Sequence, residues 1–251
     1  MLSVLPVRTP TLPPATHTNC YRLGRIVIDP ASPYADEQER TAIFAQGIDT
    51  ILLTHHHPDH IGGVEDLRRR TGAKVLGHAD SRLPFGLDGT LADGDIVDSG
   101  AGSLLALHTP GHADGHLAFQ RQGSGDVIAG DLVAGIGTIV LIRPEGNLEV
   151  YLASLARVRA VATTLYPAHG PAVPASVADD YITHRLMRTE QFRNAMRAGA
   201  STPDEIAGIV YGGIPGVNFA LAALQVRTHL AWLVARAEVA EVGERFHMIS
   251  A

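Results

Sequence analysis

The sequence predicts an α/β protein (α+β in some schemes) that ends in a small, mainly helical domain, and three observations support this prediction. The chain has 251 residues, 45% of them apolar, which is enough for one large core or a main domain with an appendage. Short apolar runs alternate with helical segments through the first two-thirds of the chain. Near residue 181 the pattern changes to long, arginine-rich helical segments. We therefore predict one domain over residues 1–180 and a second over residues 181–251.

The predicted strands of the first domain are short and apolar on both faces, as expected for strands in a covered sheet. Helices are predicted over residues 63–72, where Gly72 is a plausible C-cap, and over residues 147–162. The predicted strands are RIVID (25–29), TILLT (50–54), KVLGH (74–78), SLLALH (103–108), HLAFQ (116–120), DVIAGD (126–131) and the start of TLYPAHG (164–170).

The second domain is predicted to contain three helices and a small hairpin. A capping box, Thr202-x-x-Glu205 with Pro203 between its ends, marks the start of the middle helix. The hairpin is expected to turn at Gly243. This combination is the outline of a winged helix. The predicted elements are helices over 181–200, 201–213 and 218–239 and a hairpin over 241–250.

Composition restricts the compartment and the partners. The formal net charge of −6 does not favour global attraction to nucleic acid. Cys20 is the single cysteine, so an intramolecular disulfide and a thiolate-rich zinc site are excluded. The N-terminal MLSVLPVRTPTLPP has too short an apolar part for a signal peptide, and no apolar run approaches the roughly 18 residues that cross a bilayer. We expect a cytoplasmic protein with no membrane partner.

Residues 54–63 read THHHPDHIGG, and this stretch predicts a metal site. Two imidazoles spaced i, i+2 project together from an extended segment, whereas an Asp-His pair one turn later can face a second ion. His56 alternates with these positions and is predicted to point away from them, in a supporting or surface role. The candidate ligands of this stretch are His55, His57, Asp59 and His60.

Three further candidates follow apparent strands. They are His112 in HTPGHADGH, Asp131 in IAGDL and His169 in YPAHG, each beside a glycine or proline that permits a tight turn. Any one of these histidines could be a simple turn residue, but the ordered set at strand ends favours a metal site. Seven nitrogen and oxygen ligands are too many for one tetrahedral zinc and suit two ions that share a bridging carboxylate.

These motifs resemble those of the metallo-β-lactamase superfamily over essentially the whole chain. THHHPDH matches its T-H-x-H-x-D-H signature, and the three later candidates match its remaining ligand motifs in order. The resemblance implies an αββα sandwich with the metal site at one edge. It further implies that Asp131 bridges the two ions. By the same resemblance, the first ion is held by His55, His57 and His112 and the second by Asp59, His60 and His169.

Within the superfamily the chain departs from the true β-lactamases. The cysteine-containing class has a cysteine where this chain has Asp131, and the all-histidine class typically lacks the bridging aspartate. Persulfide dioxygenases share the histidine-rich motif, so a mononuclear iron site stays open, but they do not account for residues 181–251. The nearer resemblance is to the lactamase-β-2-like, glyoxalase II-related group, whose members carry a winged-helix-like C-terminal domain. It rests on GDLVAGIGTIVL (130–141), YLASLARV (151–158), LYPAHGPAV (165–173) and YITHRLMRTEQ (181–191).

The expected activity is hydrolysis of a small ester or thioester by a metal-bridging hydroxide, with Asp59 orienting that hydroxide and accepting its proton. Two zinc ions are the expected cofactors, although iron or manganese would also suit histidine and aspartate ligands. Tyr181, His184 and Arg185 are expected near the mouth of the site, where they could hold an anionic acid or thiol. The other residues expected to support the site or touch substrate are His116, Thr54 and Asp29.

Two alternatives remain. One is single-strand endoribonuclease or phosphodiesterase activity, because an animal member of the group cleaves single-stranded RNA. Its basic track would be Arg185, Arg188, Arg193 and Arg197, although no aromatic residues interleave for base stacking. The other is a winged helix that binds DNA without catalysis. Its recognition helix, residues 218–236, has only Arg227 and Arg236 as basic residues, so it looks instead like a core helix or a homodimer surface.

Overall fold

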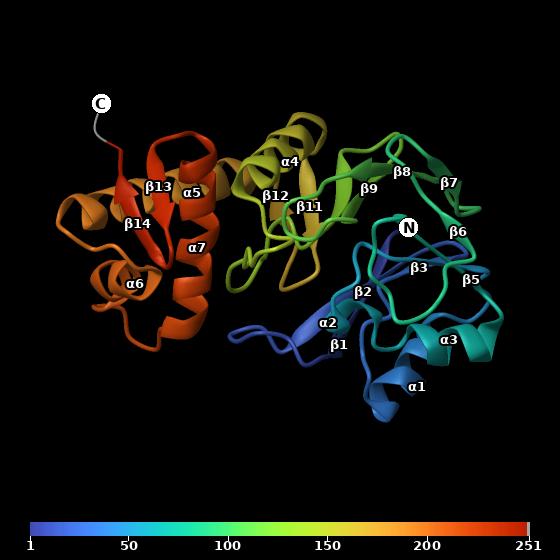
Figure 1. Cartoon of the computed structure of the whole chain (residues 1–251). Coiled ribbons are helices and arrows are strands. Elements are labelled where there is room, and N and C mark those ends of the chain that lie inside the picture. Colours follow the sequence, from blue (N-terminus) through green and yellow to red (C-terminus); the bar gives the residue numbers. More distant parts are fainter. Residues whose placement is uncertain (250–251) are drawn as a thin grey trace.

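The structure is a computed structural model that describes residues 1–249, and its first two-thirds form an αββα sandwich (Figure 1). Two six-stranded sheets pack against each other. Helices α1 (Ala35–Phe44) and α3 (Val64–Thr71) lie on the outer side of the first sheet, and α4 (Leu148–Val161) lies on the outer side of the second. The fold expected from the sequence motifs is confirmed.

The first sheet has the strand order β1-β2-β3-β4-β5-β6. Its first three strands pair antiparallel, and the strands from β3 to β6 pair parallel. Helix α1 forms the crossover from β3 to β4 and α3 the crossover from β4 to β5, whereas residues 78–88 connect β5 to β6 without a helix. Gly72 closes α3 in the left-handed conformation (φ 71°), as predicted. The strands are β1 (Ser3–Arg8), β2 (His17–Leu23), β3 (Ile26–Ile28), β4 (Thr50–Leu52), β5 (Lys74–Gly77) and β6 (Gly89–Thr90).

The second sheet has the order β12-β11-β10-β9-β8-β7. Strands β10 and β11 are parallel and are joined through α4, whose N-cap Asn147 accepts a hydrogen bond from the Val150 backbone N–H. The other neighbours pair antiparallel. The strands are β7 (Ile96–Asp98), β8 (Ser103–His108), β9 (Leu117–Arg121), β10 (Asp126–Gly130), β11 (Thr164–Pro167) and β12 (Val173–Pro174).

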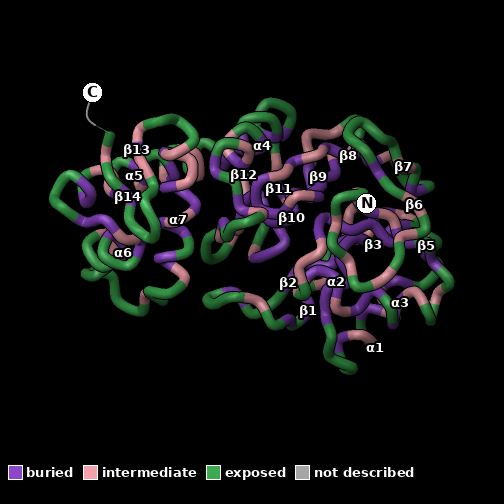
Figure 2. The backbone as a smooth tube through the Cα atoms, in the orientation of Figure 1, coloured by how far each residue is buried: buried purple, intermediate pink, exposed green. Residues whose placement is uncertain are grey.

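Successive side chains of the central strands enter different cores, which explains why these strands are apolar on both faces. In β3, Val27 packs in the core beneath α1 and α3, whereas Ile26 and Ile28 pack between the sheets with Leu104 and Phe119. Figure 2 shows that the buried backbone follows the strands of both sheets. The site therefore rests on a rigid double-sheet support.

Several elements were not predicted from the sequence: α1, the short helix α2 (Pro58–Ile61) and the strands β1, β2, β6, β7 and β12. Strand β2 reads HTNCYRL, which has no apolar alternation, yet Thr18 and Asn19 are buried. The Asn19 backbone N–H donates to the Ala168 carbonyl (2.7 Å) and its amide donates to Pro167 (2.9 Å). Partners from β11 and the loop after it thus stabilise this polar strand, and local sequence does not reveal them.

The C-terminal part contains α5 (Val177–Arg197), α6 (Pro203–Tyr211), α7 (Phe219–Ala235) and a hairpin of β13 (Val239–Val242) and β14 (Arg245–Met248). The capping box between Thr202 and Glu205 is present, and the hairpin turns at Gly243 (φ 61°), as predicted. Helix α7 ends at Ala235, before the predicted residue 239, because Ala237 adopts a left-handed conformation (φ 55°) and the chain then enters β13. Residue 250 of the predicted hairpin lies outside the described residues. The assignment to the winged-helix class stays a prediction.

Helix α5 connects the two parts without a break at residue 181. Its Ala178 packs in the core outside the second sheet, whereas its Phe192 packs in a separate core with α6 and α7. In Figure 1 the C-terminal elements lie at one end of the molecule, beyond α4. The division at residue 180 stays a prediction. Within residues 1–249, no helix has both the length and the apolar character needed to cross a membrane.

Candidate metal centre

The candidate metal centre lies at one edge of the sandwich, where loops from both sheets meet. The loop after β4 and the short helix α2 supply four side chains, and the loops that follow β8, β10 and β11 supply one each. The structure thus brings together all seven side chains singled out from the sequence: His55, His57, Asp59, His60, His112, Asp131 and His169.

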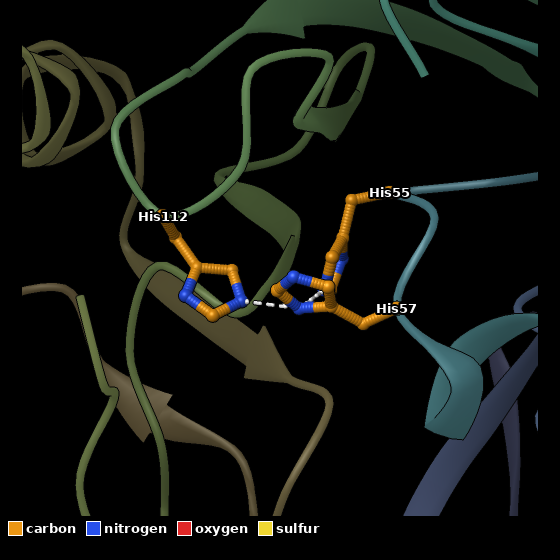
Figure 3. Close-up of side chains that lie close together, drawn as sticks. All are labelled: His55, His57 and His112. Atoms are coloured by element: carbon orange, nitrogen blue, oxygen red, sulfur yellow. Dashed lines mark hydrogen bonds between the residues drawn. The ribbon is translucent and has the colours of Figure 1, made fainter. Parts of the chain in front are cut away.

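Three imidazole nitrogens form the first cluster (Figure 3). Nδ1 of His57 lies 2.9 Å from Nε2 of His55 and 3.0 Å from Nε2 of His112. Ligands at metal–nitrogen distances of about 2.0–2.1 Å in a tetrahedral site would be roughly 3.3 Å apart, close to these spacings. Burial, reinforced by neighbouring imidazoles, lowers the pKa of His55 well below 6.5 and that of His57 to about 3. The rings are therefore neutral and present lone pairs to a cation.

The second cluster contains Asp59, His60 and His169. Oδ2 of Asp59 lies 3.5 Å from Nε2 of His169, whose Nδ1–H donates to the His17 carbonyl (3.0 Å). Nε2 of His60 is buried, and no described residue provides it with a hydrogen-bond partner. A buried ring nitrogen without a partner is costly in a folded protein, so its environment favours a ligand.

Asp131 connects the two clusters because each of its oxygens faces a different one. Oδ2 lies 3.5 Å from Nε2 of His112, whereas Oδ1 lies 3.4 Å from Nε2 of His169 and 3.6 Å from Nε2 of His60. Burial would raise the pKa of Asp131, but His60 and His169 hold it well below 3.8. The anionic carboxylate therefore has the position of a bridging ligand.

Asp29, together with Thr54, orients His60 through Nδ1, the ring nitrogen that points away from the second cluster. Its Nδ1 lies 2.8 Å from Oδ2 of Asp29, and that carboxylate also accepts hydrogen bonds from the Thr54 hydroxyl (2.6 Å) and backbone N–H (2.8 Å). Burial alone would lower the pKa of His60, yet Asp131 and Asp29 raise it well above 6.5, so a metal ion bound at Nε2 would displace a proton from this ring. Asp29 adopts φ 51°, a left-handed conformation that aspartate tolerates better than most residues. Asp29 and Thr54 thus lie behind His60, and their supporting roles stay a prediction.

His116 supports the backbone of Asp131 rather than a ligand position. Its Nε2 accepts a hydrogen bond from the Asp131 backbone N–H (3.1 Å), and its Nδ1–H donates to the Thr109 hydroxyl (2.9 Å). Both ring nitrogens are thus occupied, and burial lowers the pKa of His116 well below 6.5. A Cβ on Gly130 (φ 52°) would lie only 2.6 Å from Nε2 of His116, so this strand end requires glycine.

The remaining predicted residues lie outside the two clusters. His56 points to Glu145, with Nε2 3.2 Å from Oε2, in a supporting position. The Tyr181 hydroxyl accepts a hydrogen bond from the Ala134 backbone N–H (2.9 Å), and Tyr181 does not line the cavity that opens onto the clusters. His184 and Arg185 line a neighbouring cavity rather than the one that opens onto the clusters.

A cavity of about 380 Å³ opens onto the clusters, and ligand side chains from both form its floor. One wall is the loop 136–145, which includes Ile136, Ile139 and Ile142, and the other is the N-terminal segment 10–15. Apolar walls around a few polar groups are typical of a site for a small molecule.

Two features of the site were not predicted. The Val140 carbonyl accepts a hydrogen bond from Nδ1–H of His112 (2.8 Å) and so directs Nε2 of that ring into the first cluster. The carbonyls on either side of it are held by C-terminal residues: Arg185 donates to Ile139, and the Thr228 hydroxyl donates to Leu141 (2.7 Å). These contacts join residues far apart in the chain, so no local motif marks them.

Comparison with known proteins agrees with this geometry. Residues 13–169 match the family model of the metallo-beta-lactamase superfamily. A hydroxyacylglutathione hydrolase of Cereibacter sphaeroides (strain ATCC 17029) is 44% identical over 113 residues, a match that covers 44% of this chain and 43% of the relative. The lactamase-like protein nscB of Arthroderma gypseum is 31% identical over 224 residues, covering 79% of this chain and 70% of that protein.

Among solved structures, a metallo-beta-lactamase family protein from Thermus thermophilus superposes with a TM-score of 0.84 at 22% identity. This match covers 99% of this chain and 98% of that one, so the similarity in fold includes the C-terminal helices and hairpin. With a family model matched from the N-terminal segment to the last histidine of the second cluster, the chain belongs to the metallo-β-lactamase superfamily.

Proposed function

We propose that this protein is a dinuclear metal-dependent hydrolase that acts on a small thioester or ester. The observation that carries the proposal is the position of Asp131, whose two oxygens face different clusters of ligands. The unpartnered, buried Nε2 of His60 and Oδ1 of Asp131 support the fit, because a cation would supply the partner that each atom lacks among the described residues.

In this proposal each cluster holds one divalent ion, and Asp131 contributes an oxygen to each. Zinc is the proposed metal, because neutral imidazoles and carboxylates are its usual ligands, and iron or manganese would accept the same set. Two bound ions would make water more acidic and polarise the oxygen of the bond under attack. The ligands proposed for the first ion are His55, His57 and His112, and those for the second are Asp59, His60 and His169.

The protein's own side chains orient these groups and manage the proton. Asp59 lines the cavity, so its carboxylate can accept a proton from the attacking water at the cavity floor. His112 and His169 have their Nδ1–H groups fixed by backbone carbonyls, which keeps each Nε2 directed inward. The apolar wall of Ile136, Ile139 and Ile142 would limit access of other water molecules.

The choice of a thioester follows from the relatives. The protein from Cereibacter sphaeroides is named a hydroxyacylglutathione hydrolase, an enzyme that cleaves a thioester. The chain spans about half the length of the curated hydroxyacylglutathione hydrolases that it matches. Their thioester substrate is therefore proposed for this protein and is not assigned by similarity alone. Antibiotic hydrolysis is disfavoured, because Asp131 stands where one lactamase class has cysteine and another typically has no bridging residue.

RNA cleavage is less well supported, because the expected arginine track is not free. Arg185 is buried, with 5% of its surface exposed. Arg193 pairs with Glu190 and Glu238, and Arg197 pairs with Glu190. Four neighbouring guanidinium groups available to successive phosphates are therefore not present on α5.

The proposed function is tested by metal analysis of the purified protein, followed by rates on S-lactoylglutathione, a bis-aryl phosphodiester and single-stranded RNA. We expect about two ions per chain, preference for the thioester and loss of activity after EDTA treatment. Restoration by added zinc would show that chelation, and not unfolding, removed the activity.

A pair of variants tests the role of Asp59. Asp59→Ala should lower kcat by about 100-fold or more, since it removes both a ligand and a proton acceptor. The exposed Asp80→Ala is the matched control and should turn over normally. Full turnover by metal-free protein or by Asp59→Ala would refute the proposal, and a dominant RNA rate would replace it with the nuclease alternative.

A further inference from the structure

A second cavity of about 500 Å³, here named the C-terminal cavity, adjoins the cavity at the metal centre. Helices α5 and α7 line it on one side, and the loop that carries Ile139 closes the other. The two cavities share a wall, so a ligand that reaches beyond the metal centre can extend into the C-terminal cavity. The shared residues are Leu12, Pro13, Thr138, Ile139 and Val140.

The C-terminal cavity has positive charge without compensation. Arg185 and Arg188 both line it, and none of its lining residues is an aspartate or glutamate. Within residues 1–249, no carboxylate lies within ion-pair distance of either guanidinium, although Arg193 and Arg197 on the same helix both have acidic partners. The arginines of α5 thus divide into two that are neutralised and two that face this cavity.

Arg185 is the more unusual of the pair because it is buried. Its partners are neutral: Nη1 donates to Oε1 of Gln225 (3.1 Å), and Nη2 donates to the Ile139 carbonyl. Its Nε and the amide nitrogen of Gln225 have no acceptor among the described residues. Arginine does not lose its proton in proteins, and a buried charge without a counterion is costly. The ring of Tyr151 faces this guanidinium (5.4 Å from Cζ to the centroid) but does not neutralise its charge, so an anion in the cavity would supply the missing compensation.

Arg188 supplies a second, more accessible guanidinium on the next turn. It lies over the ring of Tyr211 (4.7 Å to the centroid), and its Nε contacts Nε2 of His184 (3.3 Å). Asn218, the N-cap of α7, also lines the cavity, so the positive end of this 17-residue helix faces the same space. Guanidinium groups in this arrangement match the oxygens of a carboxylate or phosphate.

We propose that the C-terminal cavity binds a carboxylate or phosphate group of the substrate while the scissile acyl bond lies at the metal centre. The inference rests on the proposed function and adds to it a substrate class: thioesters that carry an oxyanion remote from the bond that breaks. Arg188 would contact the anion directly. Arg185 would both contact it and, through the Ile139 carbonyl, hold the shared wall.

The test compares four thioesters with the metal-loaded, full-length protein. Acetyl-N-acetylcysteamine is neutral, S-acetylglutathione has carboxylates on the thiol, acetyl-phosphopantetheine has a phosphate there, and glutaryl-N-acetylcysteamine has a carboxylate on the acyl group. We expect kcat/KM to be at least about tenfold higher for one of the anionic compounds, and the preferred compound identifies the anion and the side that carries it.

Arg188→Gln should remove this preference, lowering kcat/KM by about 10- to 100-fold for the anionic compound and leaving the neutral one unchanged. Arg188→Lys, which retains the charge without the planar fork, should fall between. The matched control is Arg197→Gln, which removes an arginine of the same helix that already pairs with Glu190. Calorimetric titration with glutarate and with inorganic phosphate should show binding that Arg188→Gln weakens and Arg197→Gln does not.

The outcomes separate this inference from the proposed function. Equal kcat/KM for neutral and anionic thioesters, unchanged in Arg188→Gln, would overturn the anion site and leave thioester hydrolysis standing. Anion binding that depends on Arg188, in a protein that hydrolyses no thioester, would support the site and overturn the proposed function. Cleavage of single-stranded RNA that depends on Arg188, without thioester turnover, would overturn both.

Discussion

Nδ1 of His60 lies 2.8 Å from Oδ2 of Asp29, and both side chains are almost completely buried. This contact determines which nitrogen of His60 faces the second cluster, because the nitrogen that holds the proton toward Asp29 cannot bind metal. A charged hydrogen-bond partner behind a ligating histidine fixes the ring and raises its basicity. Asp29 follows β3, so the first sheet itself positions this ligand.

Asp29→Asn should weaken binding of one of the two ions by about 10- to 100-fold, because an uncharged amide with one oxygen cannot accept from both His60 and the Thr54 backbone N–H as the carboxylate does. Competition with a chromophoric chelator measures this affinity. Asp36→Asn is the control, since Asp36 forms only an exposed pair with Arg8 and should bind metal as the wild type does. Two ions held with unchanged affinity in Asp29→Asn would contradict this role.

Gly130→Ala should destabilise the protein by more than the free-energy cost of placing alanine in a left-handed conformation. The new Cβ would meet Nε2 of His116 at 2.6 Å, displacing the ring that holds the Asp131 backbone. Gly72→Ala is a matched control, because Gly72 has a similar φ (71°) and open space around its Cβ position. Urea unfolding should show a loss of about 1 kcal/mol for the control and a clearly larger loss, with lower metal content, for Gly130→Ala. Equal losses would show that steric contact is unimportant here.

Thr228→Val should lower activity although Thr228 lies on α7, far along the chain from every proposed ligand. Its hydroxyl holds the Leu141 carbonyl (2.7 Å), next to the Val140 carbonyl that orients His112. We expect a several-fold lower kcat/KM and a loss of about 1 kcal/mol in stability. Thr41→Val removes a comparable buried hydroxyl bond within α1 and should reduce stability alone. Unchanged activity in Thr228→Val would show that this hydrogen bond from the C-terminal part does not affect the metal centre.

His229 makes the stability of the C-terminal part sensitive to acid. Burial, together with Arg185 and His184, lowers the pKa of His229 well below 6.5, so the folded protein keeps this ring neutral. The unfolded chain binds a proton there below about pH 6.5. Stability is therefore complete above that pH and falls, by at most about 1.4 kcal/mol per pH unit, as the pH decreases.

Urea unfolding followed by the fluorescence of Trp232, the single tryptophan and a residue of α7, measures this effect. Between about pH 6.5 and pH 5.5 the wild type should lose more stability than His229→Gln. The exposed His247→Gln should match the wild type. An identical pH dependence in wild type and His229→Gln would rule out His229 as the acid-sensitive group.

The sequence alone determined the strands that are buried on both faces and the residues that form the candidate centre. Strands such as β4 and β10 are recognisable because both faces are covered, which makes nearly every position apolar. His55 and His57 are recognisable because their spacing places both rings on one side of an extended segment. The capping box at Thr202 has the same local character, since its two hydrogen bonds join residues three apart.

Only the tertiary structure decided which groups orient these ligands and what lies beside them. Strand β2 is polar, and partners from the second sheet hold it in place. The hydrogen bonds from α5 and α7 to the carbonyls of Ile139 and Leu141 join positions 46 and 87 residues apart. The charge of Arg185 is uncompensated because the folded chain places no carboxylate of the described residues within ion-pair distance of it. Local spacing fixes what one segment can present, whereas partners, burial and missing counterions depend on how distant segments pack.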